Sequence, residues 1–248
     1  MAADGGRWAL VTGGSRGIGR AVALTLAEQG WNVAVAYLRD HDAAEEVAAA
    51  VRAAGRDALL HAGNVGSTAT CAALVERIGK EAGRLDGLVH CAALGALSPV
   101  LDTRPGRWRL AWDTQVGALI DLAARARPLF RRGGGIVALT SLGSTRVMPG
   151  YGPIAAAKGS LEALVRYLAA ELAEEGINVN AVCGGPVDTA SLRSFPTWGA
   201  MEEESRRRVP GRLGRPEDLA PIVSFLLSPG AAWIRGQVVV ADGGFSLS

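Results

Sequence analysis

The fold of this chain is decided by one stretch near its start, Trp8-Ala9-Leu10-Val11-Thr12-Gly13-Gly14-Ser15-Arg16-Gly17-Ile18-Gly19, and by the segment 20–29 that follows it. The apolar run predicts a strand, and apolar residues at every fourth position, Ile18, Val22 and Leu26, predict one buried helix face. The glycines between them leave room for a close ligand. Backbone N–H groups and the positive end of the helix would then face an anion. This order of elements favours a dinucleotide pyrophosphate over a plain glycine turn.

The same alternation of strand and helix continues through the chain. Further strands are expected at 32–38, 57–62, 85–92, 136–140, 177–182 and 237–240. Helices are expected at 42–54, from a cap at Ser67 to 82, from Pro105, from Pro153 and at 216–227. Such alternation gives right-handed crossovers and a parallel sheet. The predicted fold is therefore α/β: a single-domain Rossmann-type, doubly wound parallel sheet of about seven strands with helices on both faces, spanning 1–248.

The bulk composition excludes several classes of function. The 248 residues have a formal net charge of +2, which gives no reason to expect a nucleic-acid partner. Cys71, Cys91 and Cys183 are scattered, which indicates reduced thiols in the cytoplasm and neither a disulfide framework nor a metal site. The segment 1–6 lacks the features of a secretory signal. No apolar run approaches a membrane span, so we expect no membrane partner.

The segments that follow the strands are where a ligand should bind, because such sheets bind ligands beyond the carboxyl ends of their strands. The longest of these segments is 183–211. It carries the apolar residues Leu192, Phe195, Pro196, Trp198 and Met201 within an otherwise polar excursion. A functional loop explains this pattern better than a disordered insert. We therefore expect a substrate lid at about 188–212.

The chain resembles the short-chain dehydrogenase/reductase family from end to end. The motifs that carry the resemblance are the glycine turn 12–19, Asn64-Val65, Ser141, Lys158, Asn178-Val179-Asn180, Val187-Asp188-Thr189, the segment 211–218, Gly236-Gln237 and Asp242-Gly243-Gly244. The family pattern places a tyrosine four residues before the lysine, where this chain has Ile154. Tyr151 lies seven residues before Lys158 instead. This spacing is similar to that of the NADPH-dependent enoyl-acyl-carrier-protein reductases called type III.

The resemblance implies which residues form the site. The implied catalytic residues are Tyr151, Lys158, Ser141 and Gln115, the last at the place of a family asparagine that serves a proton relay. The implied cofactor-binding residues are Gly13, Ser15, Arg16, Gly17, Ile18, Gly19, Arg39, Asn64, Val65, Ala92, Lys158, Val187 and Thr189. The expected substrate residues are Leu94, Met148, Leu192 and Phe195. No metal is expected.

The expected chemistry centres on Tyr151, a candidate hydrogen-bond donor to the substrate oxygen. A free tyrosine has a pKa of about 10, and a nearby ammonium from Lys158 is expected to make it more acidic. Gln115 has two open interpretations, a relay role or a satisfied core amide. His90, at the place of another family asparagine, is expected to be a structural hydrogen-bonding residue. Trp108 and Trp112 are expected to serve packing or a subunit interface.

Electrostatics favours NADPH over NADH as the cofactor. Enzymes that use NAD usually place an acid at the end of the second strand, where this chain has Tyr37-Leu38-Arg39. Arg16 lies in the glycine turn, and two guanidinium groups suit a 2′-phosphate. Asp40 is the counter-argument, because it lies near the distance at which the acid is expected.

Three functions stay open at this stage. The first is NADPH-dependent reduction of an enoyl thioester in fatty-acid or polyketide synthesis. The second is a β-ketoacyl-thioester reductase, and the third is a cofactor-binding partner subunit without catalysis. The acyl group would be carried by acyl carrier protein or coenzyme A. Arginines of the lid (Arg193, Arg206, Arg207, Arg208 and Arg212) either steer an acidic carrier or form a solvated charge run with Glu202, Glu203 and Glu204. The resemblance implies a homo-oligomer, a tetramer or dimer.

Overall fold

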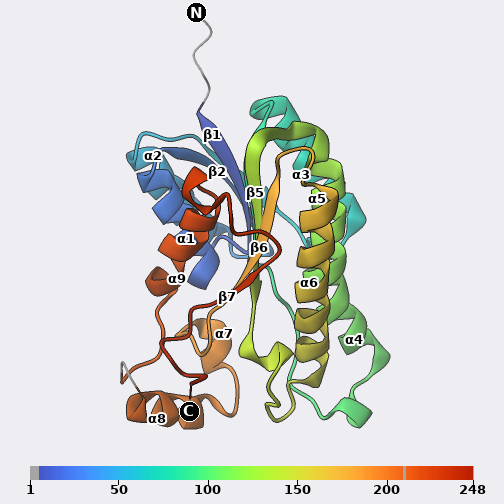
Figure 1. Ribbon diagram of the computed structural model, residues 1–248, viewed down its shortest axis with the longest axis vertical. Coiled ribbons are helices and arrows are strands. Elements are labelled where there is room, and N and C mark those ends of the chain that lie inside the picture. The colour runs from blue at the N-terminus through green and yellow to red at the C-terminus, as the bar shows by residue number, and fades with distance from the viewer. Residues whose placement is uncertain (1–5, 209–210, 248) are drawn as a thin grey trace, which may run out of the picture.

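The fold is built on a seven-stranded parallel sheet with the strand order β3-β2-β1-β4-β5-β6-β7 (Figure 1). The computed structural model describes residues 6–208 and 211–247. Most of the amino-terminal segment 1–6 and residues 209 and 210 of the predicted lid therefore lie outside the described residues. The strands are β1 (Arg7–Thr12), β2 (Trp31–Tyr37), β3 (Ala58–Ala62), β4 (Leu85–His90), β5 (Phe130–Thr140), β6 (Asn178–Cys183) and β7 (Val238–Val240). This topology confirms the predicted Rossmann-type fold.

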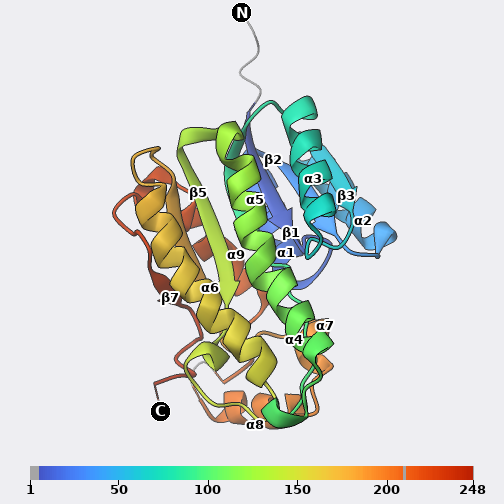
Figure 2. The same ribbon diagram turned by 90° about the vertical axis from the view of Figure 1, so that its right-hand side faces the viewer.

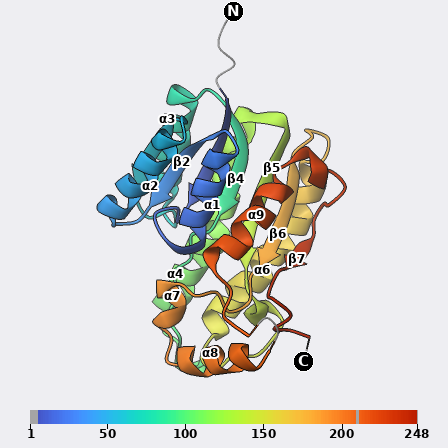
Figure 3. The same cartoon turned by 90° about the vertical axis from the view of Figure 1, so that its left-hand side faces the viewer.

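Helices cover both faces of the sheet (Figures 2 and 3). One layer contains α1 (Gly17–Glu28), α2 (His41–Ala53) and α9 (Pro216–Leu226). The other contains α3 (Thr68–Glu81), α5 (Ala118–Ala126) and α6 (Gly152–Glu171). In β1, Ala9 and Val11 pack into the first layer while Trp8 and Leu10 pack into the second. The near-continuous apolar sequence of the strand follows from burial on both faces.

The long helix predicted from Pro105 is interrupted. It consists of α4 (Pro105–Trp112), a π-helical turn η2 (Asp113–Gly117) and α5. The wide turn inserts a residue and rotates the helix face that follows it. Val116 and Leu119 are buried, whereas the preceding Trp112 is 47% exposed. Trp112 therefore does not extend the buried face of the helix.

Two local predictions differ from the structure. β5 begins at Phe130 rather than at 136, because residues 133–135 continue the strand past an irregularity in its register against β4 between Leu85 and Gly87. Ser67 occupies the N-cap position of α3, but its side chain makes no capping hydrogen bond. The remaining elements begin and end within a few residues of the predicted bounds.

The carboxyl ends of the strands meet at one edge of the sheet. We call the segment 188–212 the lid segment; its described residues, 188–208 and 211–212, lie beyond this edge and include α7 (Ala190–Arg193) and α8 (Trp198–Arg207). Figure 1 shows α8 and the carboxyl-terminal end of the chain side by side there. Across residues 6–208 and 211–247, no helix has both the length and the apolar character needed to cross a membrane.

Candidate active site

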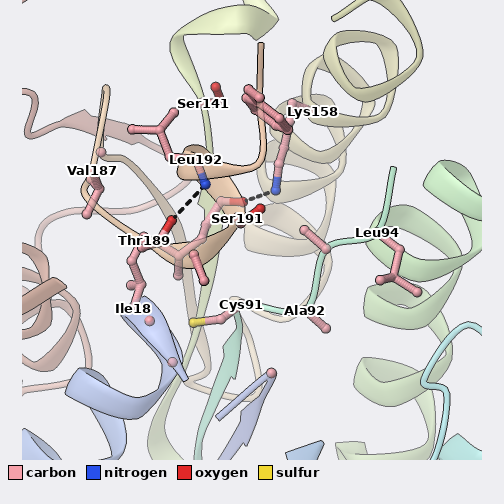
Figure 4. A pocket seen from close by; sticks show the side chains of 18 of the residues that line it. Ile18, Cys91, Ala92, Leu94, Ser141, Lys158, Val187, Thr189, Ser191 and Leu192 are labelled. Atoms are coloured by element: carbon pink, nitrogen blue, oxygen red, sulfur yellow. Dashed lines mark hydrogen bonds between the residues drawn. The ribbon is translucent and has the colours of Figure 1, made fainter. Parts of the chain in front are cut away.

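A cavity of about 1100 Å³ opens at the carboxyl edge of the sheet. Every predicted cofactor-binding and substrate residue lines this cavity, together with Ser141, Tyr151 and Lys158. Figure 4 shows Ser141 and Lys158 together, across the cavity from Ile18 and Thr189. Gln115 is the one predicted site residue that does not line it, as described below.

The glycine turn at one end of the cavity forms a cradle for an anion. Gly13 and Gly17 have positive φ angles of 65° and 54°, which favour glycine. A Cβ on Gly19 would stand 2.3 Å from the Gly13 carbonyl oxygen, so the turn closes only around a glycine there. Arg16, at the N-cap of α1, makes no side-chain capping bond. The first N–H groups of α1 are therefore available to a phosphate, and the residues present fit a dinucleotide.

The next part of the cavity has a positive charge. Arg16 and Arg39 both line it, both are exposed, and neither forms an ion pair with a residue that the structure describes. Asp40, the acid that argued for NADH, has another role. Its carboxylate accepts a hydrogen bond of 3.1 Å from the Ala43 N–H and caps α2. Asp40 also lines the cavity and is exposed, and the cap uses one of its two oxygens, so this bond weakens the argument against a 2′-phosphate without removing it.

Tyr151 lies immediately before α6, at its N-cap position, and is buried. The phenol forms a hydrogen bond with the Ser141 side chain. Its ring meets that of Phe195 from the lid segment edge-on, with the ring centroids 6.0 Å apart. Burial raises the pKa of Tyr151, and the Ser141 hydrogen bond opposes that rise. The phenol therefore remains a protonated donor at neutral pH.

Lys158 is buried within α6, seven residues after Tyr151. Its ammonium donates a hydrogen bond of 2.6 Å to the Leu139 carbonyl oxygen. Burial lowers the pKa of Lys158 to about 8. The prediction that this ammonium makes Tyr151 more acidic is wrong for this structure. Burial is the largest cause of the raised phenol pKa and Cys183 adds to it, while Ser141 is the group that lowers the pKa.

Gln115 lies behind the cavity wall rather than in it. Its side chain is fully buried in the π-helical turn and donates a hydrogen bond of 3.2 Å to the Leu94 carbonyl oxygen. The side-chain oxygen has no partner among the described residues. The adjacent Thr114 lines the cavity instead. The structure thus gives a buried amide outside the cavity that is satisfied only through its N–H donor, and the choice between a relay amide and a satisfied core amide stays open.

Three thiols lie in or near the site, and none forms a disulfide. Cys91 lines the cavity after β4, and burial raises its pKa to about 12. Cys71 and Cys183 have pKa values raised to about 11, in each case mainly by burial. All three are thus held as neutral thiols at neutral pH.

The far end of the cavity is apolar and lies under the lid segment. Leu94, Met148, Leu192 and Phe195 line it as predicted. The Thr189 hydroxyl caps α7 by accepting a hydrogen bond of 3.2 Å from the Leu192 N–H (Figure 4). Sequence reasoning missed several further residues of this wall, among them Arg146, Glu204 and Phe245.

The carboxyl-terminal segment is fastened to this end of the cavity. Arg208 donates a hydrogen bond of 2.8 Å to the Phe245 carbonyl oxygen, and its guanidinium lies 4.8 Å from the centre of that ring. Arg146 donates a hydrogen bond to the Ser246 carbonyl oxygen. Residues distant in sequence are joined here, so no local pattern could have placed Phe245 at the site.

The arginines of the lid segment are all engaged in ion pairs. Arg206, Arg207 and Arg208 pair with Glu202, Glu203 and Glu204, each four residues earlier on α8. Arg193 pairs with Asp188 at 2.6 Å, and Arg212 pairs with Asp218 at 2.6 Å. The structure therefore corresponds to the balanced charge run rather than to a free basic patch.

Comparison with known proteins places the chain in a family. A family profile described as Enoyl-(Acyl carrier protein) reductase matches residues 13–246. The chain is 38% identical to a 1-cyclohexenylcarbonyl-CoA reductase from Streptomyces collinus, over 252 residues that cover 99% of this chain and 89% of that protein. It is 34% identical to a 3-oxoacyl-(acyl-carrier-protein) reductase from Staphylococcus aureus, over 95% of this chain and 96% of that protein.

Solved structures agree with this assignment. A short chain dehydrogenase from Burkholderia cenocepacia in complex with NADP is similar with a TM-score of 0.91 at 32% identity, covering 97% of this chain and 98% of that one. The profile and these relatives each span nearly the whole chain, including the glycine turn and the strand edge that carries the site. The chain therefore belongs to the short-chain dehydrogenase/reductase family and is an oxidoreductase of the nicotinamide-dependent type.

Proposed function

We propose that this protein is an NADPH-dependent reductase of the carbon–carbon double bond in an enoyl thioester, formed as a single domain with the lid segment over its substrate. Reduction of acyl thioesters is supported by the relatives, whose names specify acyl groups on coenzyme A and on acyl carrier protein. The preference for an enoyl group rests on one observation: the donor Tyr151 stands outside α6, while Ile154 occupies the first turn of that helix.

The position of the phenol matters because the two reactions place their oxygen differently. When bound, the reduced nicotinamide supplies a hydride. In a β-keto thioester the oxygen that gains charge is bonded to the carbon that receives the hydride. In an enoyl thioester the oxygen that gains charge is the thioester carbonyl oxygen. The carbonyl carbon and the α-carbon separate it from the carbon that receives the hydride. A donor that reaches in from before the helix suits the more distant oxygen.

Tyr151 and Ser141 would then stabilise the enolate oxygen, and a proton taken up from solvent at the α-carbon would complete the reduction. Hydrogen-bond donors fixed where charge develops act most strongly in a buried site. The raised pKa keeps the Tyr151 proton in place, as a donor requires. The neighbouring apolar wall of Leu94, Met148, Leu192 and Phe195 suits a hydrocarbon acyl chain.

NADPH is the proposed cofactor because of Arg16 and Arg39. These guanidiniums lie beside the glycine turn without a carboxylate partner among the described residues, and Asp40 is engaged at the start of α2. The relative from Burkholderia cenocepacia was solved with NADP. A homo-oligomer and a cytoplasmic location stay predictions from the resemblance and the cysteine content.

The relatives also favour one alternative function, because 3-oxoacyl-(acyl-carrier-protein) reductases are similar to this chain over nearly its whole length. The deciding experiment follows NADPH oxidation by the purified protein with crotonyl-CoA, 1-cyclohexenylcarbonyl-CoA and acetoacetyl-CoA. We expect turnover of the enoyl thioesters and a loss of about 100- to 1,000-fold in kcat on Tyr151→Phe. Tyr167→Phe is the control, because Tyr167 lies 68% exposed on α6.

The other outcomes separate the remaining candidates. Turnover of acetoacetyl-CoA alone would establish the β-ketoacyl reductase and overturn the enoyl proposal. Tight NADPH binding with no turnover of any of the three thioesters would instead support the partner subunit without catalysis.

A further inference from the structure

Gly143 lies directly against the ring of Tyr151. It sits in the short turn η4 (Leu142–Ser144) that follows β5 and Ser141, and it is buried. A Cβ built on Gly143 would stand 2.4 Å from both Cδ1 and Cε1 of Tyr151, and 2.7 Å from the Met148 Cε. Non-bonded carbon atoms prefer about 3.5–4.0 Å. The ring therefore occupies the space that any side chain at 143 would need.

The requirement for glycine at this position comes from the neighbours and not from the backbone. Gly143 is absent from the described glycines that have a positive φ. An alanine could adopt its backbone conformation, and the conflict would be with the Tyr151 ring and with Met148. The Met148 contact is made by the end of a flexible side chain, which can move aside, whereas the Tyr151 contact is made by a rigid ring.

Gly143 also contacts the second hydroxyl of the site. Its backbone N–H donates a hydrogen bond of 3.3 Å to the Ser141 Oγ. Ser141 in turn forms the hydrogen bond with the Tyr151 phenol. One residue thus sets both the plane of the ring and the orientation of the hydroxyl that meets it.

The ring has a second neighbour in the lid segment. Phe195 makes an edge contact with it, with the centroids 6.0 Å apart. Gly143 and the lid segment thus both bound the position of the ring.

We propose that Gly143 is a positioning residue for Tyr151, a slot without a side chain that lets a tyrosine from before α6 reach the reacting oxygen. The inference rests on the proposed role of Tyr151 as donor. A methyl group in the slot would push the ring by about 1 Å to restore a normal contact. A misplacement of that size can cost about 100-fold in rate.

The first test compares Gly143→Ala with Gly159→Ala. Gly159 follows Lys158 on α6, and a Cβ there meets nothing closer than the Ser144 carbonyl oxygen at 4.0 Å. Both variants add one methyl group to the same region. We expect Gly143→Ala to lower kcat about 100-fold with NADPH affinity unchanged, and Gly159→Ala to change kcat by less than about twofold. Equal kcat values for Gly143→Ala and the unmodified protein would overturn the proposal.

A double-mutant cycle separates positioning from general damage. If Gly143 acts through the phenol, adding Gly143→Ala to Tyr151→Phe should lower the residual rate by less than about twofold. A further loss of about 100-fold in that background would show that Gly143 acts elsewhere. If Gly143→Ala alone does not fold, Gly143→Ala/Tyr151→Ala should fold, because the conflicting ring is gone. An unfolded double variant would overturn the proposal.

The test does not depend on which thioester is reduced. A protein that turns over only acetoacetyl-CoA would refute the enoyl function, and the same comparison would be made with that substrate. For a protein without turnover, the phenol titration is followed by tyrosinate absorbance. A ring displaced toward solvent should titrate at lower pH in Gly143→Ala than in Gly159→Ala. Identical titrations would refute the displacement.

Discussion

The hydroxyl of Thr12 lies 3.0 Å from Nδ1 of His90, which joins the ends of the two central strands β1 and β4 behind the cavity. The same Thr12 oxygen accepts a hydrogen bond of 3.1 Å from the Ala92 N–H, so its proton is directed to the imidazole. Nε2 of His90 lies 3.1 Å from the Gln115 carbonyl oxygen, which can only accept. The network therefore fixes a neutral imidazole with its proton on Nε2.

This network predicts a loss of stability in acid. Burial lowers the pKa of His90 to about 4, below its unfolded value of 6.5. Between these pH values the unfolded chain binds more protons, so the free energy of unfolding falls as the pH decreases from 6.5 toward 4. Over the whole range the contribution of this one group amounts to roughly 3 kcal/mol, of which about 2 kcal/mol falls between pH 7 and pH 5. Urea unfolding of the apoprotein at pH 7 and pH 5 measures that part.

His90→Gln provides the comparison for that measurement. An amide keeps hydrogen-bonding capacity but does not titrate, so the variant should lose less stability than the unmodified protein between pH 7 and pH 5. A variant with the same acid dependence would show that other groups carry it.

Cofactor selectivity should depend on Arg39 and not on the neighbouring Asp40. Arg39→Ala removes a charged contact to a 2′-phosphate, so we expect the Kd of NADPH to rise about 10- to 100-fold while that of NADH changes little. Fluorescence titration with each nucleotide measures both. Asp40→Ala is the matched control, since it removes the cap of α2 and should lower stability by about 1 kcal/mol without changing the ratio of the two Kd values. A ratio unaltered by Arg39→Ala would argue against NADPH selection here.

Lys158 should make the apoprotein more stable in mild alkali. Its pKa of about 8 in the fold lies below the usual 10.5, so the unfolded chain holds the proton more tightly between these values. The free energy of unfolding should therefore gain a favourable contribution as the pH rises from about 8 to 10.5. Below pH 8 the buried ammonium opposes folding.

Lys158→Met tests this sign. The variant should be at least as stable as the unmodified apoprotein at pH 7, and the stability difference between them should narrow as the pH approaches 10. The comparison between the two proteins is needed because the buried thiols, whose pKa values are raised, lower the free energy of unfolding as the pH rises. This effect is present in both proteins, so it cancels in the difference. A difference that does not change with pH would contradict a titrating Lys158.

The ion pairs on α8 predict a small effect of its arginines on catalysis. Arg206→Gln and Arg207→Gln remove charges that Glu202 and Glu203 already balance. We expect kcat/KM to change by less than about twofold with crotonyl thioesters of both coenzyme A and acyl carrier protein. A loss of kcat/KM with the acyl-carrier-protein thioester but not with the coenzyme A thioester would restore a docking role for these arginines. That loss should persist at higher salt and with excess NADPH.

The sequence allowed most of the fold to be predicted, because strands such as β1, with its apolar run from Trp8 to Val11, are short and bounded by glycine or polar turns. It also allowed Tyr151 to be placed before α6, since Pro153 marks the first turn of that helix. The π-helical turn could not be predicted, because one extra residue in a turn leaves the spacing of apolar residues nearly unchanged over a short span. Gln115 lies within this turn, so the sequence could not show whether its side chain faces the cavity.

Other parts of the site depend on contacts between distant residues. Phe245 reaches the cavity only because Arg146 and Arg208 hold the carboxyl-terminal segment against it. The slot at Gly143 is visible only once the Tyr151 ring is in place. By contrast, the pairing of the arginines on α8 has a sequence signal, the spacing of four from Glu202 to Arg206, which favours such pairs.

The π-helical turn at Asp113–Gly117 separates α4, which carries the exposed Trp112, from α5, which is packed into the core through Leu119. Removing one residue there would restore regular winding and turn the α4 half by about 100° relative to α5. Trp112 would then swing away from its present outward position, while Thr114 would leave the wall of the cavity. A single-codon deletion in this turn is thus expected to remove both the outward-facing indole and the cavity-lining hydroxyl, whereas deletions in the loops on either side would spare both.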